Sequence, residues 1–80
     1  MHLALRRAPA RELARLSPRE AEVLFWTAQG KTNAEMGIIF DLSPATVKKH
    51  LEHIYQKTGT ENRHAASVRA IEALSASPAT

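Results

Sequence analysis

Cysteine is absent from this chain, and glycine and aromatic residues are scarce. Its 80 residues include 3 glycines, and only 5% are Phe, Trp or Tyr. Without cysteine there is neither a disulfide nor a thiolate metal site, which fits a reducing compartment. No apolar run approaches the roughly 20 residues that cross a bilayer, so we expect no membrane partner. A chain of this length is expected to form one small domain with a thin core.

Positive charge is concentrated at the start of the chain. The formal net charge is +3, yet from Glu20 onward six basic residues face seven acidic ones. Any nucleic-acid binding therefore has to rest on where individual lysines lie. The opening "MHLALRRAPARELARL" is interrupted too often by arginine for a secretory signal peptide. We expect residues 1–15 to be a linker or flexible segment, extended or partly helical, whose arginines embrace the flanks of a nucleic acid or keep the linker soluble.

Helix start and stop signals divide the rest of the chain into four helices. Ser17 with Glu20, and Thr32 with Glu35, have the spacing of capping boxes, while Ser43 is followed by proline at a first helical position. The predicted helices run from Pro18 to just before Gly30, from the Thr32 cap to about Phe40, over 44–58 and over about 63–76. A folded domain over 16–76 and a tail over 77–80 are the expected division.

The second and third helices have the spacing of a helix-turn-helix unit. Two short helices joined by about three residues, the second capped by Ser-Pro, are typical of it, and Leu42 in the connection is expected to fill the core. Gly37 in mid-helix costs roughly 1 kcal/mol against alanine, which suggests the close approach of another helix.

The third helix carries the residues with the clearest chemistry. With Val47, Leu51 and Ile54 facing inward, the side chains of Lys48, Lys49 and Glu52 face outward. Such a helix enters the major groove by its N-terminal half. Lysine donates there to guanine acceptors, and a carboxylate accepts from cytosine N4.

Several motifs in fixed order resemble the LuxR-type DNA-binding domain. They are L-S-P-R-E, A-Q-G-K-T-N-A-E, S-P-A-T-V-K-K-H and I-Y-Q-K followed by N-R, within a match from about Leu16 to Ala73. The resemblance implies an all-α, four-helix helix-turn-helix bundle that serves as the output module of a bacterial transcription regulator in the cytoplasm, at the nucleoid. It implies double-stranded DNA as partner, the third helix (44–58) in the major groove, and a homodimer on DNA formed through the fourth helix.

The resemblance also assigns roles to individual residues. The base-reading positions are Lys48, Lys49 and Glu52. The contacts with the DNA backbone are Thr32, Asn33, Ser43, Thr46, Lys57 and Arg63. The dimer contacts are Val68, Ile71 and Glu72, and Glu20 is a signature residue that pairs within the domain.

The chain departs from the family pattern at two groups of positions. Phe25, Ile38 and Ile39 stand where the family mostly has polar residues. Such an apolar patch either docks on RNA polymerase or a regulatory domain of a parent chain, or covers the second helix against the N-terminal segment, or is simply tolerated. A protein-interaction module that uses these three residues is the alternative function. Thr58 and Thr60 replace Leu and Val, which removes apolar area next to the fourth helix.

Enzyme chemistry has no support in the sequence. There is no nucleophile with a partnered base and no glycine-rich phosphate loop. His50 and His53 have the spacing to share a metal, but no carboxylate cluster accompanies them. We therefore expect no catalytic residue, no metal and no cofactor.

Overall fold

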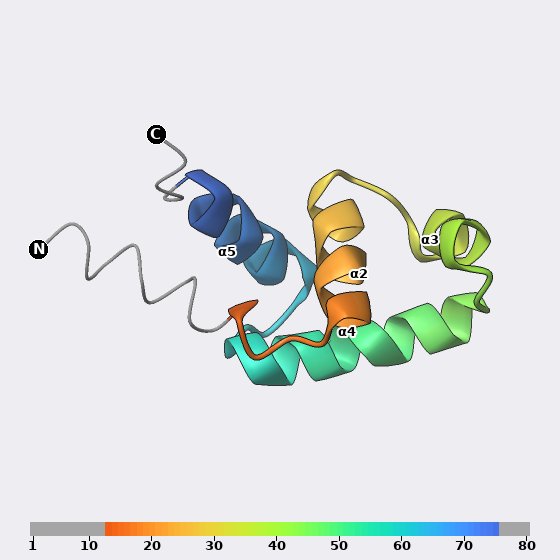
Figure 1. Cartoon of the computed structure of the whole chain (residues 1–80), viewed down its shortest axis with the longest axis horizontal. Helices are drawn as coiled ribbons and strands as arrows, with labels where there is room; N and C mark the ends of the chain where they lie inside the picture. The colour runs from red at the N-terminus through yellow and green to blue at the C-terminus, as the bar shows by residue number, and fades with distance from the viewer. Residues whose placement is uncertain (1–12, 76–80) are drawn as a thin grey trace, which may run out of the picture.

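Four helices form the architecture of this protein in the computed structural model, which describes residues 13–75. They are α2 (Pro18–Ala28), α3 (Asn33–Phe40), α4 (Pro44–Thr58) and α5 (Arg63–Ser75). In Figure 1, α4 runs along one side of the molecule, and α5, α2 and α3 lie in that order along it. Residues 13–75 contain no strand, so the predicted all-α fold is confirmed. Most of the predicted linker and the tail fall outside the described residues.

The helix boundaries follow from the caps that the sequence predicted. Both capping boxes form: the Ser17 and Thr32 hydroxyls accept from the backbone N–H of Glu20 and Glu35, whose carboxylates accept from the N–H of the capping residues. The Ser43 hydroxyl caps α4 by accepting from Thr46 N–H. These bonds satisfy donors that a helix leaves unpaired at its first turn, so each boundary is set by nearby residues.

The core lies where α2, α4 and α5 meet, and α3 closes it at one end by packing on α4. Eight hydrophobic residues are buried in it: Val23, Leu24, Met36, Val47, Leu51, Ile54, Ala66 and Ala70. The inward face predicted for α4 is confirmed, and Leu42 packs against this core as expected. A domain with a core this small depends on each of these contacts for its stability.

Thr58 is an addition to the core that the sequence patterns did not predict. Its side chain is fully buried. Its hydroxyl lies 2.7 Å from the Ile54 carbonyl oxygen, to which it donates, and 2.9 Å from the Thr60 hydroxyl. Because these bonds satisfy the hydroxyl, a threonine is accommodated where the resemblance to the LuxR-type pattern implies leucine.

The expected reason for Gly37 was wrong in one respect. A Cβ at this position would lie 2.5 Å from the backbone oxygen of Leu42, in the connection between α3 and α4. The closest neighbour is therefore the turn, and the start of the next helix, at the backbone nitrogen of Pro44, lies only in ordinary contact at 3.7 Å. The Leu42 N–H donates to the Gly37 carbonyl oxygen at 2.8 Å, and Asp41 adopts a left-handed conformation with φ of 57°. The chain thus folds back directly over Gly37, which sets the angle at which α4 leaves α3.

None of the helices among residues 13–75 is both long enough and apolar enough to cross a membrane.

Candidate nucleic-acid interface

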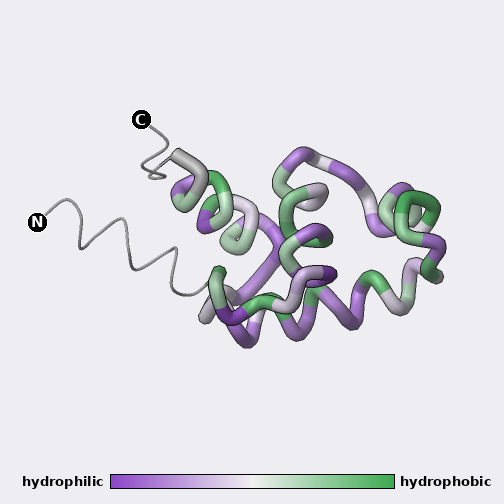
Figure 2. The backbone as a smooth tube through the Cα atoms, viewed as in Figure 1, coloured by the Kyte–Doolittle hydropathy of each residue, from purple (hydrophilic) through white to green (hydrophobic). Residues whose placement is uncertain are grey.

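The outer face of α4 presents the three residues that were predicted to read bases. Lys48, Lys49 and Glu52 are all exposed. Hydrophilic residues occupy the turns of α4 that face away from the other helices, as Figure 2 shows. Neither lysine makes an ion pair or a hydrogen bond with the rest of the described chain. Two ammonium groups are therefore available for acceptors outside the protein.

Three further residues share this outer face and were missed by the sequence analysis. Ala45, His53 and Gln56 are exposed and follow the same helical spacing as Lys49 and Glu52. The same periodicity would have identified them, had it been followed beyond the first two turns. The alanine leaves the first turn of the helix without a long side chain, so a surface can approach the backbone closely there.

Two hydroxyl groups lie together at the start of α4. The Ser43 hydroxyl accepts from Thr46 N–H at 3.1 Å, and the two side-chain oxygens are 2.9 Å apart. Both residues are exposed. Since one hydroxyl proton is used between them, the other remains to donate outward. Together with the positive end of the helix dipole, this pair suits a phosphate oxygen.

At the start of α3, the structure brings together two residues that were predicted to contact the DNA backbone and that lie 30 residues apart in the sequence. Arg63 Nη1 donates to Asn33 Oδ1 at 2.7 Å, and Nη2 donates to the backbone oxygen of Lys31. Thr32, beside them, uses its hydroxyl oxygen to accept from Glu35 N–H at 3.1 Å. The Glu35 carboxylate in turn accepts from Thr32 N–H at 2.9 Å. This bond and, to a smaller extent, the Thr32 hydroxyl hold the pKa of the Glu35 carboxyl below its usual value.

Arg63 also lies close to α4, where its charge acts on Tyr55. Burial of the Tyr55 ring raises the pKa of its hydroxyl, the positive charge of Arg63 opposes this rise, and Glu52 adds to it. The first residue of α5 thus contacts the connection between α2 and α3 while its charge is felt on α4.

Lys57, which was also predicted to contact the DNA backbone, forms an ion pair within the domain. Its Nζ lies 2.7 Å from Oε1 of Glu20, which also accepts from Ser17 N–H at 2.8 Å. Burial of Glu20 acts to raise the pKa of its carboxyl, but the bonds from Lys57 and Ser17 outweigh it and hold the pKa below its usual value. The pair joins the start of α2 to the last turn of α4, as expected for the signature glutamate.

The predicted dimer residues lie on the outer side of α5. Val68 is 39% exposed and Ile71 is 50% exposed. Glu72 follows at helical spacing and lies 4.0 Å from Nε of Arg69. Two large aliphatic side chains that remain this exposed on one helix form an apolar stripe available to another surface.

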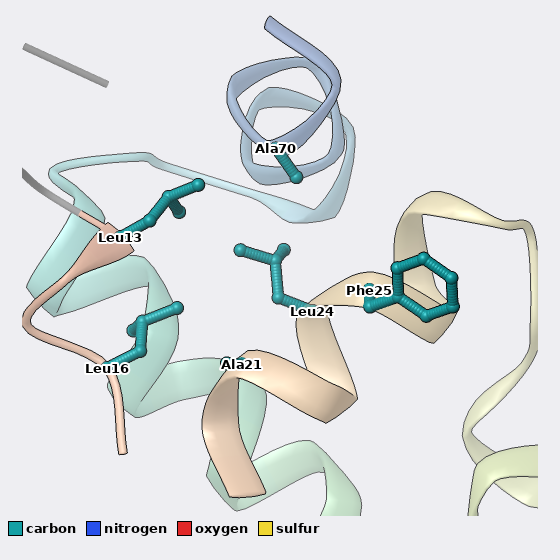
Figure 3. Close-up of a pocket in the computed structure, with 6 residues that line it drawn as sticks. All are labelled: Leu13, Leu16, Ala21, Leu24, Phe25 and Ala70. Atoms are coloured by element: carbon teal, nitrogen blue, oxygen red, sulfur yellow. The ribbon is translucent and has the colours of Figure 1, made fainter. Parts of the chain in front are cut away.

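The other exposed apolar residues are divided between two helices. Phe25 lines a pocket of about 100 Å³ with Leu13, Leu16, Ala21, Leu24 and Ala70, and its ring packs edge-on against Trp26. In Figure 3, Leu13, Leu16 and Leu24 converge below Ala70 of α5. Ile38 and Ile39 lie on α3 instead, and Ile38 is 83% exposed. The three residues therefore do not share one element.

Among residues 13–75, no three side chains of His, Cys, Asp or Glu are grouped so that they could hold an ion.

Comparison with known proteins shows clear similarity to bacterial regulators. Residues 14–70 match the family described as "Bacterial regulatory proteins, luxR family". Over 57 residues the chain is 46% identical to the HTH-type quorum sensing-dependent transcriptional regulator RpaR of Rhodopseudomonas palustris, covering 71% of this chain and 24% of RpaR. It is 39% identical over 56 residues to the transcriptional activator protein AhyR of Aeromonas hydrophila, with 70% and 22% covered.

A third relative is a repressor. The chain is 37% identical over 59 residues to the transcriptional repressor ThaA of Burkholderia thailandensis, with 74% of this chain and 25% of ThaA covered. The chain thus spans about a quarter of the length of these relatives. No solved structure matches it significantly.

Proposed function

The chain belongs to the luxR family of bacterial regulatory proteins, and we propose that it is the sequence-specific DNA-binding domain of a transcription regulator. Family membership supports DNA binding and regulation of transcription in general. The roles of individual helices and residues are inferred from the geometry of the described residues. The work of such a domain would take place at the nucleoid, in the bacterial cytoplasm.

In this proposal α4 enters the major groove by its N-terminal half. Lys48 and Lys49 donate to guanine O6 and N7, while Glu52 accepts from cytosine N4 and repels phosphates when α4 is out of register. The single observation that carries the proposal is the accessibility of the two lysine side chains. They are exposed on the outer face of α4 and have no partner within the described chain.

Contacts with the DNA backbone would set the position of α4 in the groove. Ser43 and Thr46 offer a hydroxyl donor at the start of α4, and Thr32 and Asn33 lie at the start of α3. Lys57 and Arg63 remain candidates as well, although both cations already have a partner inside the domain. Such contacts fix register without reading sequence.

The apolar stripe on α5 supports a homodimer on DNA. Val68 and Ile71 would pack against the same residues of a second copy, with Glu72 at the rim. A two-fold axis at α5 would place two α4 helices about one turn of DNA apart, ~34 Å, so the site would be a two-fold symmetric pair of half-sites. One pair of helices buries little area, so we expect the dimer to form on DNA.

Selection from a randomised duplex pool, at two salt concentrations, tests the proposal. The expected result is a two-fold symmetric motif enriched at both salts, with affinity that falls steeply as salt rises, because the cations displace condensed counterions. The variant Lys48→Gln/Lys49→Gln should lose the motif. The control Arg15→Gln/Arg19→Gln removes the same charge from exposed residues outside α4. It should keep the motif even where Arg15 contacts the flanks of the site, because contacts with the DNA backbone carry no sequence information. Salt-sensitive binding by the wild-type chain without any motif would refute specific reading.

Exposure of the α3 isoleucines favours a second candidate, a surface for a protein partner. Ile38 is 83% exposed, on a helix that packs mainly on α4. The partner would be RNA polymerase or a regulatory domain of a longer chain. Ile38→Ser should then reduce transcription from a reporter while DNA affinity stays unchanged. A loss of both together would assign Ile38 to the DNA-binding surface.

A further inference from the structure

Arg63 holds a place in the fold that differs from that of the other cations near the predicted interface. It is the first residue of α5 and is half-buried, whereas Lys48 and Lys49 are exposed. Two of its guanidinium nitrogens are engaged at once, one by the Asn33 side chain and the other by the Lys31 backbone oxygen. A planar guanidinium that donates to two acceptors in this way fixes both of them relative to its own helix.

This contact determines which way the Asn33 amide faces. Because a guanidinium only donates, the atom that faces it has to be the carbonyl oxygen of the amide. The NH₂ group then points away from Arg63, and within residues 13–75 it has no hydrogen-bond partner. Asn33 is also the first residue of α3, where backbone N–H groups are left without helical partners. The result is an oriented amide donor beside the positive end of a helix.

The geometry points to Arg63 as a positioning residue that aims the Asn33 amide NH₂ at a DNA phosphate. The inference rests on the proposed DNA binding and adds a division of labour to it. Asn33 makes the contact, and Arg63, in place of the direct backbone contact considered above, acts through Asn33 without touching the phosphate itself. Bonding to the Lys31 carbonyl further holds the connection before α3 against α5, so the donor stays in place when DNA is absent.

Two substitutions at Asn33 and Arg63 separate contact from positioning. Asn33→Asp keeps an oxygen for Arg63, and thus the internal bond, but replaces the NH₂ donor by a charge that repels phosphate. Arg63→Lys keeps the positive charge but provides a single ammonium group that cannot match two acceptors in one plane. We expect each to weaken binding to the selected operator by about tenfold, the scale of one hydrogen bond to a charged group.

The matched control for Asn33→Asp is Asn62→Asp. Asn62 Oδ1 accepts from Ala65 N–H at 2.9 Å at the start of α5, and an aspartate there keeps that bond while adding the same negative charge. Its affinity for the operator should stay within about twofold of the wild-type value, since a lone exposed charge contributes little. Thermal unfolding followed by circular dichroism establishes that each variant is folded at the assay temperature.

Two readouts then distinguish positioning from a direct phosphate contact. In an Asn33→Ala background, Arg63→Lys should cause no further loss of affinity, because the group that it positions is gone. Arg63→Gln should leave the slope of log affinity against log salt unchanged, whereas loss of a phosphate contact would reduce that slope by about 0.9. Additive losses, or a reduced slope, would overturn the inference.

If Arg63→Lys does not fold, Arg63→Gln takes its place in the Asn33→Ala background, and the Asn33 variants test the phosphate contact itself. Binding by Asn33→Asp as tight as that of Asn62→Asp would overturn the inference, while a tenfold gap would support it. Failure of the wild-type chain to bind any duplex would refute the proposed function itself. Wild-type binding combined with additive effects would refute only the role given to Arg63.

Discussion

Replacing Gly37 by alanine is the substitution for which local and tertiary reasoning predict opposite results. Helix propensity alone predicts that Gly37→Ala stabilises α3 by roughly 1 kcal/mol. The added Cβ, however, would lie 2.5 Å from the Leu42 backbone oxygen, where ordinary contact begins at 3.4 Å. The backbone of the turn would have to move by about 0.9 Å, the difference between these distances.

The expected net effect is a loss of stability. Overpacking of this kind costs about 1–3 kcal/mol. The shift also weakens the 2.8 Å bond from Leu42 N–H to the Gly37 carbonyl oxygen, which contributes about 1 kcal/mol. After the gain in propensity is subtracted, Gly37→Ala should lower the free energy of unfolding by about 2 kcal/mol. For a domain of this size the melting temperature would fall by roughly 10 °C.

Urea denaturation and thermal melts followed by circular dichroism measure this directly. The control is Ala34→Gly, an exposed position on the same helix, which should cost about 1 kcal/mol and so calibrates the propensity of α3. A Gly37→Ala variant as stable as the wild-type chain, or more stable, would refute the reasoning. It would mean that the turn relaxes without cost and that the angle between α3 and α4 is not held at this point.

Three other changes have expected outcomes. The pKa of the Glu20 carboxyl is lowered in the folded state, so its contribution to stability is present above pH 4.5 and is lost as the pH falls below that value. In thermal melts at a series of pH values, Glu20→Gln should therefore reduce the loss of stability on acidification. An unchanged loss would count against the pairing with Lys57. Thr58→Ala removes a methyl group and a bonded hydroxyl from a fully buried site. Urea denaturation should show a free energy of unfolding lower by about 1–2 kcal/mol. An unchanged free energy would mean that the surrounding side chains fill the space without cost. Lys49→Ala should weaken operator binding by about 1–3 kcal/mol and relax the preference at one base pair, as measured by fluorescence anisotropy on operator variants. An equal loss of affinity on all sequences would make Lys49 a contact with the DNA backbone.

Much of the fold could be predicted from residues that are close together in the chain. Ser17, Thr32 and Ser43 each cap a helix through a bond to a residue three positions later. The inward face of α4 followed from the periodicity of its aliphatic residues. The exposure of Lys48 and Lys49 followed from the same periodicity, because a residue's side of a helix depends only on its spacing from the buried ones.

The sequence by itself therefore determined the four helices, their caps and the outer face of α4, since each depends on bonds or spacings within a few residues. Only the tertiary structure decided what the long-range partners are. Lys57 meets Glu20 across 37 residues and Arg63 meets Asn33 across 30, and the neighbour of Gly37 turned out to be a carbonyl of the following turn. Such contacts depend on the angles at which packed helices cross and turns close, and these angles are set by the whole core at once.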